Sequence, residues 1–427
     1  MNIIRFPYGK EHLEYAFGDD ELSAVLTSHI EDYIPDANAE ELVERALREP
    51  IGSPALSELS RGKRNVVIIA SDHTRPVPSR VIIPPMLREI RKGNPDASIT
   101  ILIATGCHRG TTKEELIAKF GEEIVENENI YIHDCDERER LVNIGTLPSG
   151  GECEINRIAY EADLLVSEGF IEPHFFAGFS GGRKSVLPGI AGRTTVLANH
   201  CSEFIADERA RTGSLEGNPI HRDMLWAAKQ ARLAFIVNVV LNSKKEPIFA
   251  VAGDSELAHK RGTDFISSLC AVNAEPADIV VSTNGGYPLD QNVYQAVKGM
   301  TAAEAAVRAG GVIIMLAASA DGAGGDHFYH HLADERDINK TIALFMSRKR
   351  NETVPDQWES QILLRILSRA TVIYVSNMPS ETVREMHMIP AASLKEAMSV
   401  AKEIVKKEKP SVIAIPDGVS VIVNSKA

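Results

Sequence analysis

The sequence predicts an α/β protein with two α/β domains and mostly parallel sheets. Short β-branched runs alternate with amphipathic stretches almost from end to end of the 427 residues, and this alternation is typical of βαβ units. The apolar runs are nearly continuous, as expected for strands covered on both faces. A chain of this length exceeds what one hydrophobic core usually supports, so two domains are expected.

In the first part of the chain, apolar runs that each end in polar residues predict four strands, at residues 64–76, 98–110, 129–137 and 162–174. Helical patterns separate them. Apolar residues recur at helix spacing from Val81 to Ile90, and Thr112 with Glu115 forms a capping box before the next apolar pair. Strand and helix therefore alternate as a parallel sheet requires.

The sequence pattern changes near residue 271, where "AVNAEPAD" is interpreted as a polar linker between domains. A fresh strand, "IVVSTNGG", follows it. The pattern then predicts a helix over 290–300, a second helix from 301, and strands at 311–319 and 370–378. We expect an N-terminal domain at 1–270 and a C-terminal domain at 275–409. The strand-and-turn segment from 410 to 427 is not assigned by sequence to either domain.

Composition restricts the class of partner and the compartment. A net charge of −13 argues against nucleic acid or an anionic membrane as partner. No apolar run reaches the roughly 20 residues of a membrane span, and the first 18 residues lack a signal-peptide core, so a cytoplasmic protein is expected. Five dispersed cysteines without a C-x-x-C pair fit reduced thiols better than a disulfide framework.

Residues suited to chemistry follow the predicted strands. "SDHTRP" (71–76) ends the first, "TGCHRG" (105–110) ends the second, and His174 follows the fourth, with Lys184 and His200 farther on. Open α/β sheets bind ligands beyond the carboxyl ends of their strands, so these segments are predicted to converge on one rim. Taken singly, each histidine fits a structural hydrogen bond as well as catalysis.

The stretch "GFSGGRKS" (178–185) comes within one residue of a phosphate-binding P-loop. The second motif glycine is Arg183, and about ten residues separate the stretch from the preceding strand, so a nucleoside-triphosphate site is not expected. Gly178, Gly181 and Gly182 are expected to let the backbone approach a ligand closely. The alternative is an ordinary surface turn.

The second domain offers weaker signals. In "YPLDQNVYQAVKGM" the side chains of Gln291, Gln295 and Lys298 share one helical stripe, which suits a carboxylate or phosphate but equally a solvated face. Trp358, in a polar context, fits a pocket wall or a packing residue at a rim. The histidines of "DHFYHH" (326–331) are read as a solvated face rather than a metal site.

Together these motifs resemble the nickel-dependent lactate racemase family over essentially the whole chain. The resemblance rests on "SDHTRP", "TGCHR", "EPHFFAGFSGGRKSVLPGIAG", "NH" at 199–200 and "YPLDQNVYQAVKGM", which occur in the expected order. The glycine-rich block is long and specific.

The resemblance implies a cofactor, nickel(II) pyridinium-3,5-bisthiocarboxylate mononucleotide. Lys184 matches the lysine that tethers it covalently through a thioamide, and His200 matches the histidine that binds the nickel. Imidazole and sulfur donors suit a square-planar Ni(II). The loop that matches the rest of the cofactor and substrate site consists of Asp72, His73, Thr74 and Arg75.

The resemblance also implies paired acid/bases and a substrate-binding set. His108 and His174 match the two catalytic histidines, which would alternate as base and acid during hydride transfer through a 2-oxo acid intermediate. The residues expected to bind substrate are Arg75, Gln295, Lys298 and, from its polar context, Trp358. Because these come from both domains, the active site is expected in the cleft between them.

The expected function is therefore racemisation or epimerisation of a 2-hydroxy acid, with lactate first and another 2-hydroxy acid as the alternative. A cofactor of this kind implies cofactor-building enzymes as maturation partners, and the oligomeric state is left open. An NAD-type dehydrogenase is disfavoured because no G-x-G-x-x-G follows the first strand. A non-catalytic ligand sensor on the same fold is disfavoured because His108, His174, Lys184 and His200 are all present.

Overall fold

The computed structural model describes residues 2–18 and 21–425, which form two compact units. Unit 1 comprises residues 1–28, 201–213 and 269–427, and unit 2 comprises residues 29–200 and 214–268. Each unit has a six-stranded sheet and its own hydrophobic core, which confirms the predicted class of two α/β domains. None of the helices in the described ranges has the length and apolar character that a bilayer crossing requires.

Unit 2 is built on a sheet with the order β13-β12-β9-β4-β5-β6. All neighbours are parallel except the edge pair β12 and β13. The strands are β4 (Asn65–Ser71), β5 (Ser98–Ala104), β6 (Asn129–Ile132), β9 (Leu164–Phe170), β12 (Leu233–Leu241) and β13 (Pro247–Gly253). Two short antiparallel pairs accompany the sheet: β7 (Leu141–Thr146) with β8 (Glu152–Asn156), and β10 (Pro173–His174) with β11 (Gly178–Phe179).

The two helices that the sequence pattern predicts in this unit, over Val81–Ile90 and after Thr112, are both present. The capping box at Thr112 is formed, with both reciprocal hydrogen bonds to Glu115. The helices are α1 (Ala39–Arg48), α2 (Leu56–Leu59), α3 (Ser79–Gly93), α4 (Lys113–Phe120), α5 (Glu122–Asn127), α6 (Arg157–Tyr160), α7 (Arg193–Asn199), α9 (Pro219–Gln230) and α10 (Leu257–Cys270). Apolar residues of α1, α3 and the central strands make up the core.

Unit 1 contains a parallel sheet with the order β18-β17-β16-β15-β19-β3. Its strands are β3 (Leu22–Val25), β15 (Ala277–Thr283), β16 (Val307–Leu316), β17 (Thr371–Val375), β18 (Ile389–Ala391) and β19 (Val412–Ile415), with the smaller pairs β1 (Asn2–Tyr8) and β2 (Glu11–Phe17), and β14 (Ala271–Ala274) and β20 (Ile422–Ser425). Its helices are α8 (Ser202–Ala206), α11 (Val293–Ala306), α12 (Asp326–Ala333), α13 (Ile338–Ser347), α14 (Gln357–Arg369), α15 (Ser380–Glu385) and α16 (Leu394–Val405).

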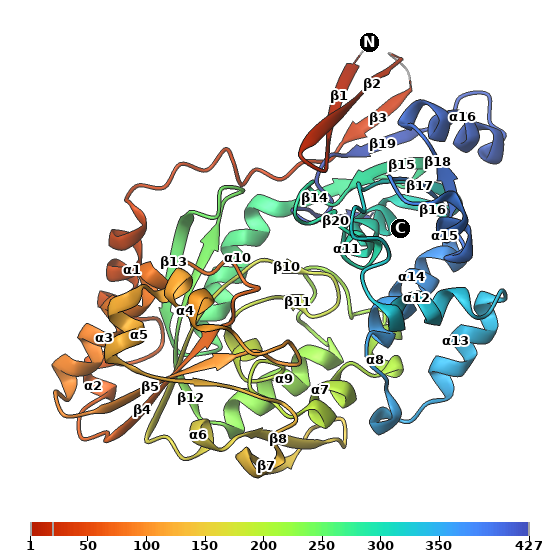
Figure 1. The fold of residues 1–427 in the computed structure, drawn as a ribbon. Helices are drawn as coiled ribbons and strands as arrows, with labels where there is room; N and C mark the ends of the chain where they lie inside the picture. Colours follow the sequence, from red (N-terminus) through yellow and green to blue (C-terminus); the bar gives the residue numbers. More distant parts are fainter. Residues whose placement is uncertain (1, 19–20, 426–427) are drawn as a thin grey trace. The chain divides into compact units, whose positions relative to one another are not determined.

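The N-terminal 28 residues join unit 1, whereas the sequence predicts them in the first domain. Strand β3 pairs in parallel with β19, so the start and the end of the chain lie side by side, red against blue in Figure 1. Phe6 and Phe17 of the β1–β2 hairpin are fully buried in the core of unit 1. The C-terminal segment also belongs to this unit through β19 and β20, and its last two residues, 426 and 427, lie outside the described ranges.

Two further expectations for the second half need correction. The stretch 271–274, predicted as a linker, is strand β14, which pairs with β20. The two helices predicted at 290–300 and from 301 are one helix, α11, which begins at Val293. Thr301 Oγ1 donates to Lys298 O at 2.6 Å, so its side chain bonds back within the same helix and does not begin a new one.

Candidate active site

The sheet of unit 2 reverses its strand order beside β4. Strands β5 and β6 follow on one side of β4, and β9 and β12 lie on the other. Connections leave β4 and β9 in opposite directions, and such a switch point in a parallel sheet is where ligands bind. Residues 72–75 directly follow β4, His108 follows β5 and His174 follows β9, so these predicted residues share one sheet edge.

Asp72 and His108 form the tightest contact of this edge. His108 Nδ1 lies 2.7 Å from Asp72 Oδ2, while Asp72 Oδ1 accepts hydrogen bonds from the Thr74 hydroxyl (2.7 Å) and the Thr74 backbone N–H (3.2 Å). Burial acts to raise the pKa of Asp72, but the hydrogen bonds from His108 and Thr74 outweigh it and hold that pKa below its usual value. Asp72 is thus an ionised carboxylate that fixes the ring of His108, whose side chain is 43% exposed.

The other two members of the 72–75 loop have different surroundings. His73 Nδ1 lies 3.1 Å from Thr111 Oγ1 and 3.7 Å from a carboxylate oxygen of Glu115, so His73 ties its own loop to the start of α4. Arg75 is exposed, and its carbonyl accepts a hydrogen bond from Lys119 Nζ at 3.1 Å. Of the four, the exposed Thr74 and Arg75 are the ones positioned to meet a ligand.

Three predicted site residues surround the ring of Phe176. The His174 ring centroid lies 4.6 Å from that of Phe176 and the His200 centroid 5.1 Å, both edge to face, and Lys184 Nζ lies 5.8 Å from it. The Ala177 N–H donates to His174 Nδ1 at 3.3 Å. The structure therefore gathers His174, Lys184 and His200 into one cluster.

His200 ends α7 in a buried position suited to a neutral imidazole. Burial, assisted by the charge of Lys184, lowers the pKa of His200 to about 4. Its Nδ1 lies 2.9 Å from the Val196 carbonyl oxygen, so Nδ1 carries the proton and donates, and the ring lone pair is on Nε2. A histidine in this state is ready to bind a metal through Nε2.

The glycines of the 178–185 loop serve packing within the chain, and their approach to a ligand stays a prediction. Gly178 and Gly181 have φ of +77° and +76°, and a Cβ at Gly178 would lie 2.3 Å from the Ser214 carbonyl oxygen. A Cβ at Gly181 would lie 2.7 Å from Asn238 Oδ1. The close neighbours are the chain's own atoms, so glycine is required there by backbone conformation and packing.

Unit 1 brings together the predicted residues of α11 and α14. Lys298 Nζ donates to Gln295 Oε1 at 2.6 Å, and both side chains are half-buried. Gln291 precedes the helix, so it does not share the predicted stripe. Trp358 and Tyr294 are both half-buried and are hydrogen-bonded to each other, so Trp358 packs against the residue that precedes Gln295.

Two family models cover most of the chain. One, described as the lactate racemase N-terminal domain, matches residues 8–213, and the other, the lactate racemase C-terminal domain, matches residues 272–423. A protein named lactate racemase from Thermoanaerobacterium thermosaccharolyticum is 56% identical over 427 residues, which is all of both chains. Another of that name from Lactiplantibacillus plantarum is 53% identical over 424 residues, 99% of this chain and 100% of the relative.

The chain belongs to the lactate racemase family. It is accordingly an enzyme of the isomerase class, a racemase, as the sequence predicts. The structure of the lactate racemase apoprotein from T. thermosaccharolyticum superposes with a TM-score of 0.95 at 55% identity, over 99% of this chain and 100% of that one. A protein from Thermotoga maritima shares the fold at 20% identity and a TM-score of 0.64, over 92% of this chain and 100% of that one.

Sequence reasoning missed a buried carboxyl that supports the site of this racemase. Glu168 Oε1 accepts hydrogen bonds from the Ser79 hydroxyl (2.6 Å) and from the backbone N–H of Ser71 (3.3 Å), so it holds both ends of the 72–78 loop. Burial raises the pKa of Glu168, with Lys119 opposing the rise. The signal was present, since "DLLVSEGF" carries one charged residue inside an apolar strand.

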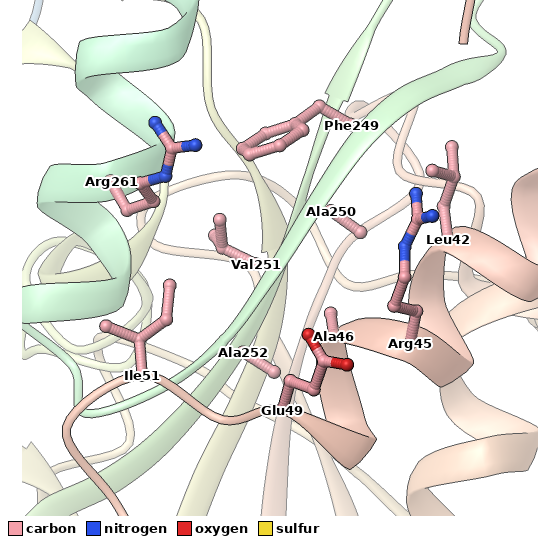
Figure 2. Close-up of a pocket in the computed structure, with 10 residues that line it drawn as sticks. All are labelled: Leu42, Arg45, Ala46, Glu49, Ile51, Phe249, Ala250, Val251, Ala252 and Arg261. Carbon is pink, nitrogen blue, oxygen red and sulfur yellow. The ribbon is translucent and has the colours of Figure 1, made fainter. Parts of the chain in front are cut away.

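The cavity drawn in Figure 2 is separate from these residues. It has a volume of about 230 Å³ and lies against α1, the edge strand β13 and α10 within unit 2. The guanidinium of Arg261 lies 5.5 Å from the ring centroid of Phe249 on its wall. The lining contains none of the predicted site residues; it consists of Leu42, Arg45, Ala46, Glu49, Ile51, Phe249, Ala250, Val251, Ala252 and Arg261.

Glu359, beside Lys298, predicts a pH-dependent stability. Burial raises the pKa of Glu359 from 4.5 to about 8, against the opposing charge of Lys298 and with a contribution from Asp356. The folded protein thus binds this proton more tightly than the unfolded chain, and the free energy of unfolding falls as pH rises from 4.5 towards 8. We expect Glu359→Gln to match the parent at pH 5 and to exceed it by about 3 kcal/mol at pH 8.

Urea unfolding at pH 5 and pH 8, with the fluorescence of the two tryptophans as the signal, measures this difference. The exposed Glu381 of α15 provides the matched control, since Glu381→Gln should leave the stability unchanged at both pH values. An equal effect of Glu359→Gln at the two pH values would contradict the prediction.

Proposed function

We propose that this protein interconverts the two enantiomers of lactate. The observation that carries the proposal is identity of 56% and 53%, over essentially the whole chain, to two proteins named lactate racemase. The chemistry at the sheet edge of unit 2 supports it, because histidine is the side chain best suited to exchange protons near neutral pH.

His108 is proposed as the base that takes the hydroxyl proton of lactate. Its contact with Asp72, at 2.7 Å through Nδ1, directs Nε2 outwards as the proton acceptor. The adjacent carboxylate stabilises the imidazolium that forms. The proton then stays on Nε2 until lactate is re-formed, in either configuration.

His174 is proposed as the second acid/base, for the enantiomer whose hydroxyl points the other way. Its environment differs from that of His108: it stacks on Phe175 with centroids 5.0 Å apart, and its Nδ1 accepts from the Ala177 N–H at 3.3 Å. Protonating Nδ1 would break that contact. His174 therefore exchanges its proton at Nε2, in surroundings that differ from those of His108.

The residues present fit the nickel-pincer cofactor that the resemblance implies. The neutral, buried His200 offers Nε2 as a metal ligand, and the Lys184 amine stands on the same Phe176 ring as the covalent attachment point. When bound, the cofactor would accept the α-hydrogen of lactate as hydride and return it to either face. The chain's own contribution is to hold and exchange the hydroxyl proton and to orient the substrate.

Arg75 and Lys298 are proposed to neutralise the lactate carboxylate. The exposed guanidinium of Arg75 can bind a carboxylate through two parallel hydrogen bonds. Lys298 supplies a point charge whose position is fixed by its 2.6 Å contact with Gln295, and Trp358 remains a candidate wall of the substrate site.

The decisive experiment uses protein produced together with the cofactor-building enzymes that this cofactor requires. We expect intact mass to show one adduct at Lys184 with one equivalent of nickel, and chiral chromatography to show racemisation of either lactate enantiomer. Lys184→Ala should lose adduct, nickel and activity, whereas Lys245→Ala, at an exposed turn, should retain all three.

An adduct that survives in Lys184→Ala would contradict the proposed tether. A protein that carries the adduct but racemises another 2-hydroxy acid in the same assay, and not lactate, would contradict the proposed substrate. A protein that carries the adduct and racemises neither lactate nor any other 2-hydroxy acid in the assay would contradict the proposed catalysis.

A further inference from the structure

Two of the five cysteines meet beside the proposed base. Cys107 lies three residues after the end of β5, and Cys135 lies three residues after the end of β6. These strands are parallel neighbours, with Ile103 opposite Ile132. The topology therefore brings two distant cysteines to the same sheet edge, where their thiols are hydrogen-bonded to each other.

Backbone and side-chain contacts hold the two loops together just before each cysteine. Thr105 Oγ1 donates to the His133 carbonyl oxygen at 2.6 Å, and the His133 N–H donates to Ile103 O at 3.0 Å. The contact of the thiols is thus fixed by the strand ends. Thiols in hydrogen-bond contact need only a small movement to reach the S–S bond length of about 2.05 Å.

The surroundings divide the pair into an attacking and a resolving thiol. The hydrogen bond from Cys135 lowers the pKa of Cys107 despite its burial, and the charge of Arg193 lowers it further. The pKa of Cys135 is raised by that same hydrogen bond and by burial. Cys107 is half-buried and Cys135 is buried, so a small oxidant meets Cys107 first.

A metal site explains the same residues less well. Side-chain ligand atoms of Asp134, Cys135 and Asp136 lie within 4.8 Å of one another. However, Asp136 is engaged by Arg193, whose Nε and Nη2 donate to its two oxygens at 2.8 and 2.7 Å. Because Arg193 occupies the Asp136 carboxylate and Cys107 is the partner of the Cys135 thiol, a dithiol describes these residues better than a metal site.

We propose that Cys107 and Cys135 are a redox-active dithiol that a hydroperoxide converts reversibly into a disulfide. The Cys107 thiolate attacks one peroxide oxygen and becomes a sulfenic acid, while the other oxygen leaves as hydroxide and takes up a proton. The Cys135 sulfur then attacks the Cys107 sulfur, and water leaves. Two thiols and one hydrogen peroxide thus yield one disulfide and two waters, and an external dithiol such as dithiothreitol reverses the step.

Oxidation is expected to lower activity, an expectation that rests on the proposed function. His108 directly follows Cys107, and its N–H donates to Thr105 O at 3.0 Å within the same turn. Drawing Cys107 towards Cys135 displaces the His108 ring from Asp72. Because misplacement of a catalytic group by about 1 Å costs up to about 100-fold, we expect at least about tenfold lower activity, restored by dithiothreitol.

The test applies hydrogen peroxide to the full-length protein, with and without the cofactor. The parent should lose two of its five thiols and about 2 Da of mass, and peptide mapping should join Cys107 to Cys135. Cys135→Ser should accumulate a sulfenic acid at Cys107, trapped by dimedone, while Cys107→Ser should keep its four thiols. Dithiothreitol should restore the parent's mass and all five thiols.

Five intact thiols after treatment of the parent, or a disulfide between other cysteines, would overturn the proposal without reliance on any variant. A Cys107–Cys135 disulfide that left activity unchanged would overturn the link to His108. Protein that forms the disulfide but never racemises lactate, before or after reduction, would count against the proposed function and leave the dithiol standing.

Discussion

Asp72→Asn should lower kcat for lactate racemisation by about 100- to 10,000-fold. The asparagine can keep the shape of the site, because its side chain is isosteric and Thr74 still has an acceptor for its hydroxyl. It removes the negative charge that stabilises the His108 imidazolium. Its amide group can also donate to His108 Nδ1, which would shift the proton to Nε2 and leave no lone pair there to act as a base.

A double-mutant cycle separates this positioning role from a general structural one. If Asp72 acts through His108, then Asp72→Asn should cost almost nothing further in a His108→Ala background. Nickel content and Lys184 adduct should be unchanged in all three variants, because the proposed attachment points of the cofactor are Lys184 and His200. Additive losses in kcat, or loss of cofactor from Asp72→Asn, would instead mean that Asp72 supports the site as a whole.

Periodicity and strand-end chemistry predicted much of the fold and the candidate site. The apolar runs at 64–76 and 98–110 contain β4 and β5, and the polar residues after them are those that meet as Asp72 and His108. Such features are local in sequence. The pairing of β3 with β19 joins Leu22 to Val412, and no local pattern encodes which edge of which sheet a four-residue strand will extend.

The site's internal contacts were equally hidden from a single sequence. Gly181 signalled an unusual backbone, yet the atoms it must clear belong to Asn238, 57 positions later. The likeness of 178–185 to a P-loop drew attention to Arg183 as a mismatched glycine. In the structure, the Arg183 side chain is instead buried and hydrogen-bonded beside the proposed cofactor lysine.

Arg183→Met should destabilise the folded protein by about 3 kcal/mol or more. Arg183 is 1% exposed, and its Nη2 donates to Ala177 O at 2.8 Å while Nε donates to His221 Nδ1 at 3.0 Å. Nη1 lies 3.0 Å from His259 Nε2 and also approaches the carbonyls of the 178–185 loop. Burial lowers the pKa of both histidines, to about 3 for His221, so both are neutral. His221 Nδ1 accepts the Nε–H, whereas His259 Nε2 also lies 2.8 Å from the Ser180 carbonyl oxygen.

Two opposing energies decide the sign. Removing the cation relieves a desolvation cost, since burial lowers the pKa of Arg183 to about 9. Methionine, however, leaves the Ala177 carbonyl and the His221 ring without their donor, at about 1–3 kcal/mol each. Because several acceptors depend on one guanidinium that braces the loop before Lys184, the loss of hydrogen bonds should exceed the relief.

Urea unfolding at pH 7 provides the measurement, with Arg222→Met on the exposed face of α9 as the matched control, expected within about 0.5 kcal/mol of the parent. The fraction of protein with a Lys184 adduct offers a second readout, which should fall for Arg183→Met because the loop that presents the lysine is loosened. Equal stability of Arg183→Met and the parent would mean that the desolvation cost of the buried cation cancels the free energy of its hydrogen bonds. The conformation of the loop would then depend on its glycines alone.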